Sequence, residues 1–356
     1  MKNILSKSKA PVWLSFILFG VVLLMASCND DNDATPKMSI SSICDEPIEP
    51  TEITINGEDV KKLGQYRVSF QKSGPDTTRL DVSVKDFYPS NGFPSFTIPC
   101  AACPSEDCIR FSSDLASQNA EQTNVKISGE INKDKELKIN IEYTVVNTPL
   151  IKTSFDFSSD DIRLFSLKSL NTFDLFFNID GVKYNMVDVS KDGLEEMKRQ
   201  FGKVFKKIRL EFGDNGKLAI WAIWNNASNY EKWMEVRYWL SDQTDCMFLH
   251  FTDQQAKEFC KVLVNNPSSA TKLFQTFPGE GVYQWEMTYH IKNYMLSIAI
   301  ADVVSTKTFL CEWMDNKALV GATDKEKSIL VPFRYVAESL TDVGPVFDGI
   351  YMNSYR

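Results

Sequence analysis

Residues 125–145 read VKISGEINKDKELKINIEYTV, and this stretch decides the fold of the first part of the chain. Apolar and polar residues alternate on either side of a charged centre. The alternating apolar positions are Val125, Ile127, Leu137, Ile139, Ile141 and Tyr143. Alternation with a period of two is typical of a strand that buries one face. The stretch therefore predicts a β-hairpin in an antiparallel sheet.

The same pattern extends upstream to residue 51. Residues 51–55, 66–70 and 80–84 alternate in the same way, and Asn56-Gly57 and the segment 73–76 supply turn residues between them. Short alternating strands with regularly spaced turns indicate an all-β unit, closed as a barrel or paired as a sandwich. We expect this unit to cover residues 51–150.

Three short motifs in this unit resemble the calycin-like, lipocalin-like β-barrel domains of Bacteroidetes surface lipoproteins. They are Lys85-Asp86-Phe87, Ile98-Pro99 and the Gly-containing hairpin 129–134, within residues 55–150. The chain departs from the family pattern in a cysteine-rich insert after Pro99. The resemblance implies a barrel fold and a surface location, and it implies no reaction.

Residues 151–356 change to a mixed α and β pattern. Asp180-Gly181 and Asn215-Gly216 predict two hairpins. Asp192 with Glu195, and Thr252 with Gln255, have the spacing of helix capping boxes. We interpret the apolar runs 308–314 and 329–336 as strands. The prediction is a second barrel-like α+β domain with two or three helices, so that the whole chain is mainly β with some α.

The first 27 residues have the pattern of a lipoprotein signal peptide. Lys2, Lys7 and Lys9 precede an apolar tract over 12–25, which ends at Met25-Ala26-Ser27-Cys28. The tract is too short for an ordinary membrane span, and small residues before a cysteine resemble the lipobox. We expect cleavage before Cys28 and attachment of a fatty-acylated lipid, such as one carrying palmitate, to that cysteine.

Residues 28–50 begin with an acidic cluster, and we expect them to form a flexible tether. An acidic run after the lipid cysteine resembles the surface-export signal of Bacteroidetes-type lipoproteins, and a plain solvated linker is the alternative. We expect an outer-membrane protein, lipid-anchored at the cell surface. The formal net charge is −8, and it becomes more negative when the signal lysines leave. Nucleic acid is therefore not an expected partner, since phosphate binding needs a concentrated positive face.

The cysteines suggest oxidation rather than metal binding. Cys100, Cys103 and Cys108 lie close together in the chain, with Cys44 upstream. Disulfides are the commoner fate in an oxidising compartment, so we expect one disulfide among Cys100, Cys103 and Cys108. Cys108 could close a small loop with Cys103 or with Cys100, and Cys44 could staple the tether. Free thiols and a four-cysteine zinc site are the alternatives. We predict no metal and no cofactor. Three further cysteines lie in apolar surroundings and are expected to be inert: Cys246, Cys260 and Cys311.

No catalytic motif is apparent. His250 and His290 both lie within predicted strands, and neither has the partners of a triad or a metal pair at a suggestive spacing. The chain contains no nucleophile elbow, P-loop, HExxH or dinucleotide fingerprint. We therefore expect a protein that is not an enzyme. A hydrolase using a pair of carboxylates stays open, because sequence cannot place such a pair.

One strand carries the sharpest candidate for a binding site. Regular alternation places Trp233, Glu235, Arg237 and Trp239 on the same face of the strand 233–240. Two indoles with a charged donor and acceptor between them would suit a sugar ring. The alternative interpretation is that these tryptophans pack inside a barrel.

These observations predict a non-catalytic binding module, for a glycan or for another small, apolar ligand. A structural or interaction subunit that docks on an envelope protein is the first alternative, and the carboxylate-dependent hydrolase is the second.

Overall fold

A computed structural model describes residues 36–61, 66–74, 78–85, 96–113, 117–120, 123–146, 148–151, 154–164, 176–240, 246–276, 282–292, 295–300, 303–339 and 350–354. The signal peptide and Cys28 lie outside the described residues, as do Asp86 and Phe87 of the resemblance.

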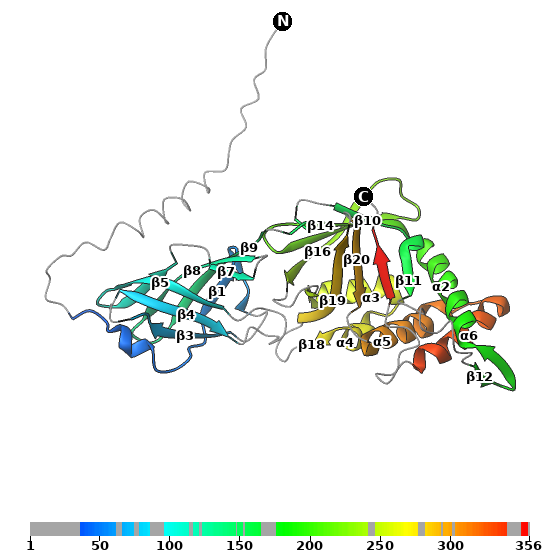
Figure 1. Cartoon of the computed structure of the whole chain (residues 1–356), viewed down its shortest axis with the longest axis horizontal. Coiled ribbons are helices and arrows are strands. Elements are labelled where there is room, and N and C mark those ends of the chain that lie inside the picture. Colours follow the sequence, from blue (N-terminus) through cyan, green and yellow to red (C-terminus); the bar gives the residue numbers. More distant parts are fainter. Residues whose placement is uncertain are drawn as a thin grey trace, which may run out of the picture.

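The chain is mainly β, with one sheet curved into half a barrel and another that forms a nearly closed barrel. Figure 1 shows two bodies side by side, with the α-helices gathered in the C-terminal body. The prediction of a mainly β chain with barrel-like sheets is confirmed at this level.

The N-terminal sheet has the hydrogen-bonded order β2-β1-β9-β8-β6-β5-β4-β3, and β7 pairs with β8. The pairing of β1 with β9 is parallel. In the predicted hairpin, β8 and β9 place Ile127 opposite Ile141. The strands are β1 (Glu52–Ile55), β2 (Glu58–Asp59), β3 (Arg67–Lys72), β4 (Arg79–Lys85), β5 (Phe96–Pro104), β6 (Cys108–Ser112), β7 (Ser117–Ala120), β8 (Thr123–Asn132) and β9 (Leu137–Val145).

The alternation of apolar and polar residues decides which face of this sheet is buried. In β9, Leu137, Ile139, Ile141 and Tyr143 are buried while the residues between them are exposed or half-buried. Burying each such side chain stabilises the fold by about 1.5–3 kcal/mol. Gly129 of β8 is required by the same packing, because a Cβ there would collide with the Phe111 ring.

The cysteine-rich segment after Pro99 is part of this sheet rather than an insert. Cys100 and Cys103 lie in β5 and Cys108 begins β6, and Cys103 pairs across the ladder with Arg110. Cys103 is disulfide-bonded, whereas Cys100 and Cys108 are free thiols. The pairings of Cys108 that we expected are therefore not formed, because regular strand pairing places an arginine opposite Cys103.

The C-terminal sheet has the order β10-β14-β15-β16-β17-β19-β20-β21-β11, and β18 pairs with β19. Its end strands β10 and β11 are separated in the chain only by residues 158–161, so the sheet has to curl. The strands are β10 (Ser154–Phe157), β11 (Ile162–Leu164), β14 (Phe205–Phe212), β15 (Lys217–Trp224), β16 (Glu231–Leu240), β17 (Cys246–Thr252), β18 (Gln275–Thr276), β19 (Val282–Lys292), β20 (Met295–Ile300) and β21 (Ile350–Asn353).

A separate hairpin, β12 (Phe176–Ile179) with β13 (Val182–Asn185), forms at the predicted Asp180-Gly181 turn, where both residues have positive φ. The predicted hairpin at Asn215-Gly216 also forms, between β14 and β15.

The described residues contain more helices than the two or three predicted. They are α2 (Met186–Gly202), α3 (Asp253–Val264), α4 (Ala270–Leu273), α5 (Val303–Trp313) and α6 (Asp324–Glu338). The predicted start of α3 is confirmed, with Thr252 and Gln255 forming a capping box. The predicted start of α2 at Asp192 is wrong, because the Asn185 side chain accepts from two backbone N–H groups and begins the helix earlier.

Helices α5 and α6 occupy both segments that we predicted as strands. Helix α6 begins at the capping box of Thr323 and Glu326, and it buries Leu330, Phe333 and Val336 at helical spacing. A short apolar run has no clear period, so pattern alone does not separate a strand from a buried helix. Helix α2 lies on α6, where Gly193 leaves room for the Phe333 ring.

The two sheets meet at the β14–β15 turn. The Asn56 side chain donates to the Asn215 carbonyl over 2.9 Å, and Val145 N donates to the Asp214 carbonyl over 2.7 Å. Glu58 forms ion pairs with Lys217 and Arg237. These contacts join the edge of the N-terminal sheet to the outer face of β15 and β16.

Candidate functional site

The inner face of the C-terminal sheet is apolar along β15, β17 and β19. β15 contributes Leu218 and Ile220, and β17 contributes Met247 and Leu249. The register places Met247 opposite Met287 and Leu249 opposite Trp285 of β19, so these side chains lie on one face. A curved sheet with such a face has to be covered by other elements.

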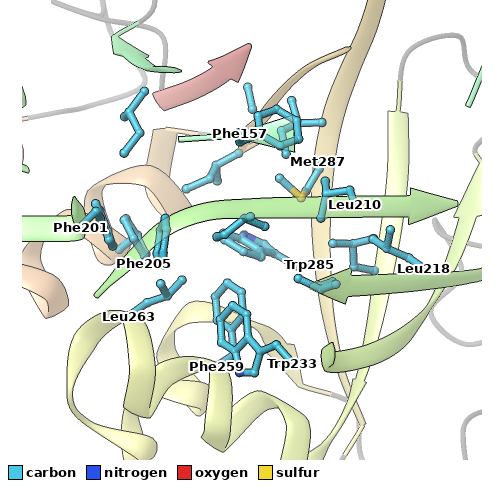
Figure 2. Close-up of a pocket in the computed structure, with 18 of the residues that line it drawn as sticks. Phe157, Phe201, Phe205, Leu210, Leu218, Trp233, Phe259, Leu263, Trp285 and Met287 are labelled. Atoms are coloured by element: carbon cyan, nitrogen blue, oxygen red, sulfur yellow. The ribbon is translucent and has the colours of Figure 1, made fainter. Parts of the chain in front are cut away.

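Helices supply the cover. Phe201 comes from α2, Phe259 and Leu263 come from α3, and Phe309 comes from α5. Phe259 and Leu263 are four residues apart in α3, on the face that the capped helix turns toward the sheet. Figure 2 shows side chains from strands and helices pointing toward one another around the space between them.

The sheet and helices line a cavity of about 150 Å³. Every described side chain that lines it is aliphatic, aromatic or a thioether, and none of these side chains is ionisable. Such a wall can hold an apolar molecule by burial and dispersion.

Aromatic rings form one corner of this cavity. The Phe259 ring stacks on Trp233, with centroids 5.7 Å apart, and meets Trp285 edge-on at 5.2 Å. Phe274 lies 5.5 Å from Trp285 and 5.7 Å from Phe259, so the three rings pack against one another. The corner fixes the orientation of Trp285, which lies centrally among the labelled residues in Figure 2.

A β-bulge brings Trp233 into this corner. Ile220 pairs with Met234 but Trp221 pairs with Lys232, so Trp233 is an extra residue in the ladder. A bulge re-aims the side chain at the extra position. Trp233 therefore leaves the face to which regular alternation assigned it and lines the cavity.

Of the other three residues of the expected platform, Arg237 and Trp239 contact the N-terminal sheet, whereas Glu235 pairs within the C-terminal sheet. Glu235 pairs with Lys232 over 2.6 Å, and Arg237, whose side chain is 10% exposed, pairs with Glu58. Trp239 is 3% exposed and lies 4.9 Å from the Tyr143 ring. Trp233, Glu235, Arg237 and Trp239 thus form no shared, solvent-facing platform, because of the bulge at one end and the contact between the two sheets at the other.

His250 has a structural environment. Its Nδ1 accepts from the Trp239 indole over 3.2 Å, and its Nε2 lies 2.8 Å from the Gln284 side-chain oxygen. An indole N–H can only donate, so Nδ1 carries no proton and Nε2 donates to Gln284. Burial, with the nearby Arg237 charge, lowers the pKa of His250 to about 4 despite the Gln284 bond. The second histidine, His290, is exposed on β19.

Cys260 and Cys246 pack in or against the hydrophobic core. Cys260 is fully buried in α3, and burial raises its pKa to about 12. Burial also raises the pKa of Cys246 to about 12, with Glu286 beside it. These thiols stay protonated at neutral pH, and protonated thiols are poor nucleophiles.

Among the residues that the structure describes, no group of three or more His, Cys, Asp or Glu side chains could hold a metal ion. None of the described helices has both the length and the apolar character to cross a membrane.

No protein-family model, curated protein or solved structure matches this chain. The case for a function therefore rests on the geometry described above.

The sequence predicted the start of α3 at Thr252 and Gln255, but it did not single out Phe259, Leu263 or Trp285 as cavity residues. Trp285 stands in a strand whose alternation is ordinary, and only the pairing of β19 with β17 and the packing of α3 place it in the cavity. The local sequence carries no signal for that placement.

The His250 environment predicts a pH-dependent stability. Because its folded pKa of about 4 lies below the ordinary 6.5, native protein holds the neutral ring. Its contribution is complete above about pH 6.5 and falls by about 3 kcal/mol as the pH drops to about 4. In His250→Gln, whose amide can still accept and donate, the loss of unfolding free energy over this range should be smaller by that amount. Denaturant titrations at several pH values measure it.

His290→Gln is the matched control, since an exposed histidine changes its surroundings little on folding. A wild-type pH profile in His250→Gln would contradict the environment described for His250.

Proposed function

We propose that this protein is a lipid-anchored envelope protein that binds a small apolar molecule without transforming it. The observation that carries the proposal is the cavity of about 150 Å³ between the C-terminal sheet and its helices, whose lining is wholly apolar.

The size of the cavity argues for a ligand rather than for loose packing. Protein interiors contain few voids larger than a water molecule, and an apolar void costs about 24 cal/mol per Å³. A cavity of about 150 Å³ would thus cost about 3–4 kcal/mol when empty. In another protein, an apolar cavity of similar volume stays dry and binds benzene or xenon.

The chemistry of the wall favours an apolar ligand over a glycan. A sugar needs several hydrogen-bond partners around its ring, and buried hydroxyl groups without partners are costly. The side chains of the lining offer only two indole N–H groups, those of Trp233 and Trp285. The expected sugar platform on β16 has Trp239 and Arg237 buried against the N-terminal sheet, so it supports the glycan interpretation poorly.

Location is the second part of the proposal. The basic start, the short apolar tract and Cys28 support lipidation, and the acidic residues after Cys28 support export to the outer-membrane surface. In this account the lipid holds the protein at the membrane while the C-terminal half binds its ligand.

The anchor is tested by Cys28→Ala. This variant should lose incorporation of labelled palmitate and accumulate as an uncleaved precursor, because the modified thiol is absent. Cys44→Ala is the control, and it should label and fractionate like the wild type. Labelling of Cys28→Ala at the wild-type level would rule out this anchor.

Binding is tested with fluorobenzene, followed by its ¹⁹F resonance in the presence of the protein. Ile220→Trp should weaken binding at least tenfold, because the larger ring occupies the cavity. Ile223→Trp makes the same substitution on the opposite face of the same strand and should bind like the wild type. Thermal melts confirm that both variants are folded.

The proposal fails if the wild type does not bind fluorobenzene. It also fails if folded Ile220→Trp and Ile223→Trp bind it equally well.

A further inference from the structure

The outer face of the C-terminal sheet carries a row of polar and aromatic side chains on β10, β14 and β15. The strand register places Asp156 of β10 opposite Arg209 of β14, and it places Arg209 opposite Trp221 of β15. Their neighbours along the two longer strands, such as Leu210 and Ile220, line the cavity on the inner face. Asp156, Arg209 and Trp221 are half-buried, so each keeps part of its surface in contact with solvent.

Hydrogen bonds and ring contacts hold this row in place. The Trp221 indole N–H donates to the Glu211 carboxylate over 2.8 Å. Arg209 donates from two nitrogens to the two carboxylate oxygens of Asp156, over 2.7 and 3.0 Å. The Arg209 guanidinium also lies 4.2 Å from the centre of the half-buried Tyr230 ring. Side chains that are ordered in this way before a ligand binds lose little freedom on binding.

The charges of this face balance one another. Asp156 and Glu211 are acids, and Arg209 and the exposed Lys207 are bases on the same side of β14 and β10. The hydrogen bonds from Arg209 lower the pKa of Asp156, so this carboxylate stays ionised at neutral pH. A balanced face has no general attraction for a polyanion or a polycation. Recognition here has to use ring contacts and directed hydrogen bonds.

The loop between β15 and β16 adds polar side chains beside the row. Lys206 of β14 donates to the Ala227 carbonyl over 2.9 Å, and Tyr230 at the end of the loop contacts Arg209, so the loop lies next to the start of β14. Four loop side chains with amide or hydroxyl groups are exposed: Asn225, Asn226, Ser228 and Asn229. The loop therefore offers further donors and acceptors close to the two rings.

These groups match the two kinds of surface that a sugar ring presents. Its C–H groups pack on aromatic rings, and its hydroxyl groups both donate and accept hydrogen bonds. An extended peptide is a poorer match, because it binds a sheet by pairing with an unpaired edge. Here β14 and β15 are central strands that pair on both sides.

We propose that this outer face binds a neutral carbohydrate, with the sugar ring lying on Trp221 and Tyr230. The sugar hydroxyl groups exchange hydrogen bonds with Asp156, Arg209 and Glu211. This site is separate from the apolar cavity on the inner face, so the inference goes beyond the proposed function and does not depend on it.

The test applies the labelled whole chain to an array of neutral glucan, mannan and galactan oligosaccharides and of sulfated and uronic-acid oligosaccharides. The wild type should bind at least one neutral oligosaccharide, which is then titrated against the variants. Trp221→Leu keeps apolar bulk on the sheet but loses the ring, and it should weaken this binding at least tenfold. Tyr230→Leu should weaken it as well. Tyr335→Leu is the matched control, since Tyr335 of α6 is exposed but lies outside the row.

Fluorobenzene separates the two sites. Trp221→Leu should bind it like the wild type, whereas Ile220→Trp should lose fluorobenzene and keep the oligosaccharide, because the two residues face opposite sides of β15. Thermal melts show which variants are folded.

Unchanged oligosaccharide binding in folded Trp221→Leu and Tyr230→Leu would overturn the inference. A wild type that binds only the anionic oligosaccharides, or none on the array, would also overturn it. Failure of the wild type to bind fluorobenzene would instead overturn the proposed function and leave this site standing.

Discussion

The apolar inner face of the C-terminal sheet is the constraint on which the rest of this half depends. One concave side of the sheet carries Leu218 of β15, Leu249 of β17 and Trp285 of β19. Leaving so much apolar surface in contact with water is unfavourable. Helices α2, α3 and α5 cover that side, and α6 in turn packs on α2 and α5. Curvature keeps the helices from filling the space completely, and the remaining volume is the cavity.

The outer face of the same sheet contacts the N-terminal sheet. Strand β16 contributes residues both to this contact and to the cavity wall. At the start of β16 the bulge turns Trp233 inward, and further along Arg237 and Trp239 face the N-terminal sheet. Arg237 is nearly buried and depends on Glu58 of the other sheet for its charge partner. The residues that resemble a binding surface in sequence are thus divided between the cavity wall and the joint between the two sheets.

Much of the fold could be predicted from local signals. The alternation in β8 and β9, the turns at Asp180-Gly181 and Asn215-Gly216, and the cap at Thr252 all act within a few residues, and the structure confirms them. Segments without a clear period were not predictable in this way. The apolar runs that became α5 and α6 contain strand-like stretches, and in the structure α6 packs against α2 and α5.

The candidate site was less predictable than the fold, for a related reason. One extra residue at Trp233 reverses the face on which a tryptophan lies, and the register of β15 against β16 that creates the bulge is not visible in either strand alone. The cavity depends on contacts such as those between Trp285 and Phe259, which are distant in sequence. Apolar residues at these positions indicate burial, but they do not indicate that space remains between them.

A crystal structure determined under xenon pressure would reveal the apolar cavity, because xenon enters dry apolar cavities without needing a specific contact. We expect xenon density between Trp285, Phe259 and the inner face of β15, with no ordered water at that position. Protein side chains filling this volume, or ordered water in place of xenon, would contradict it.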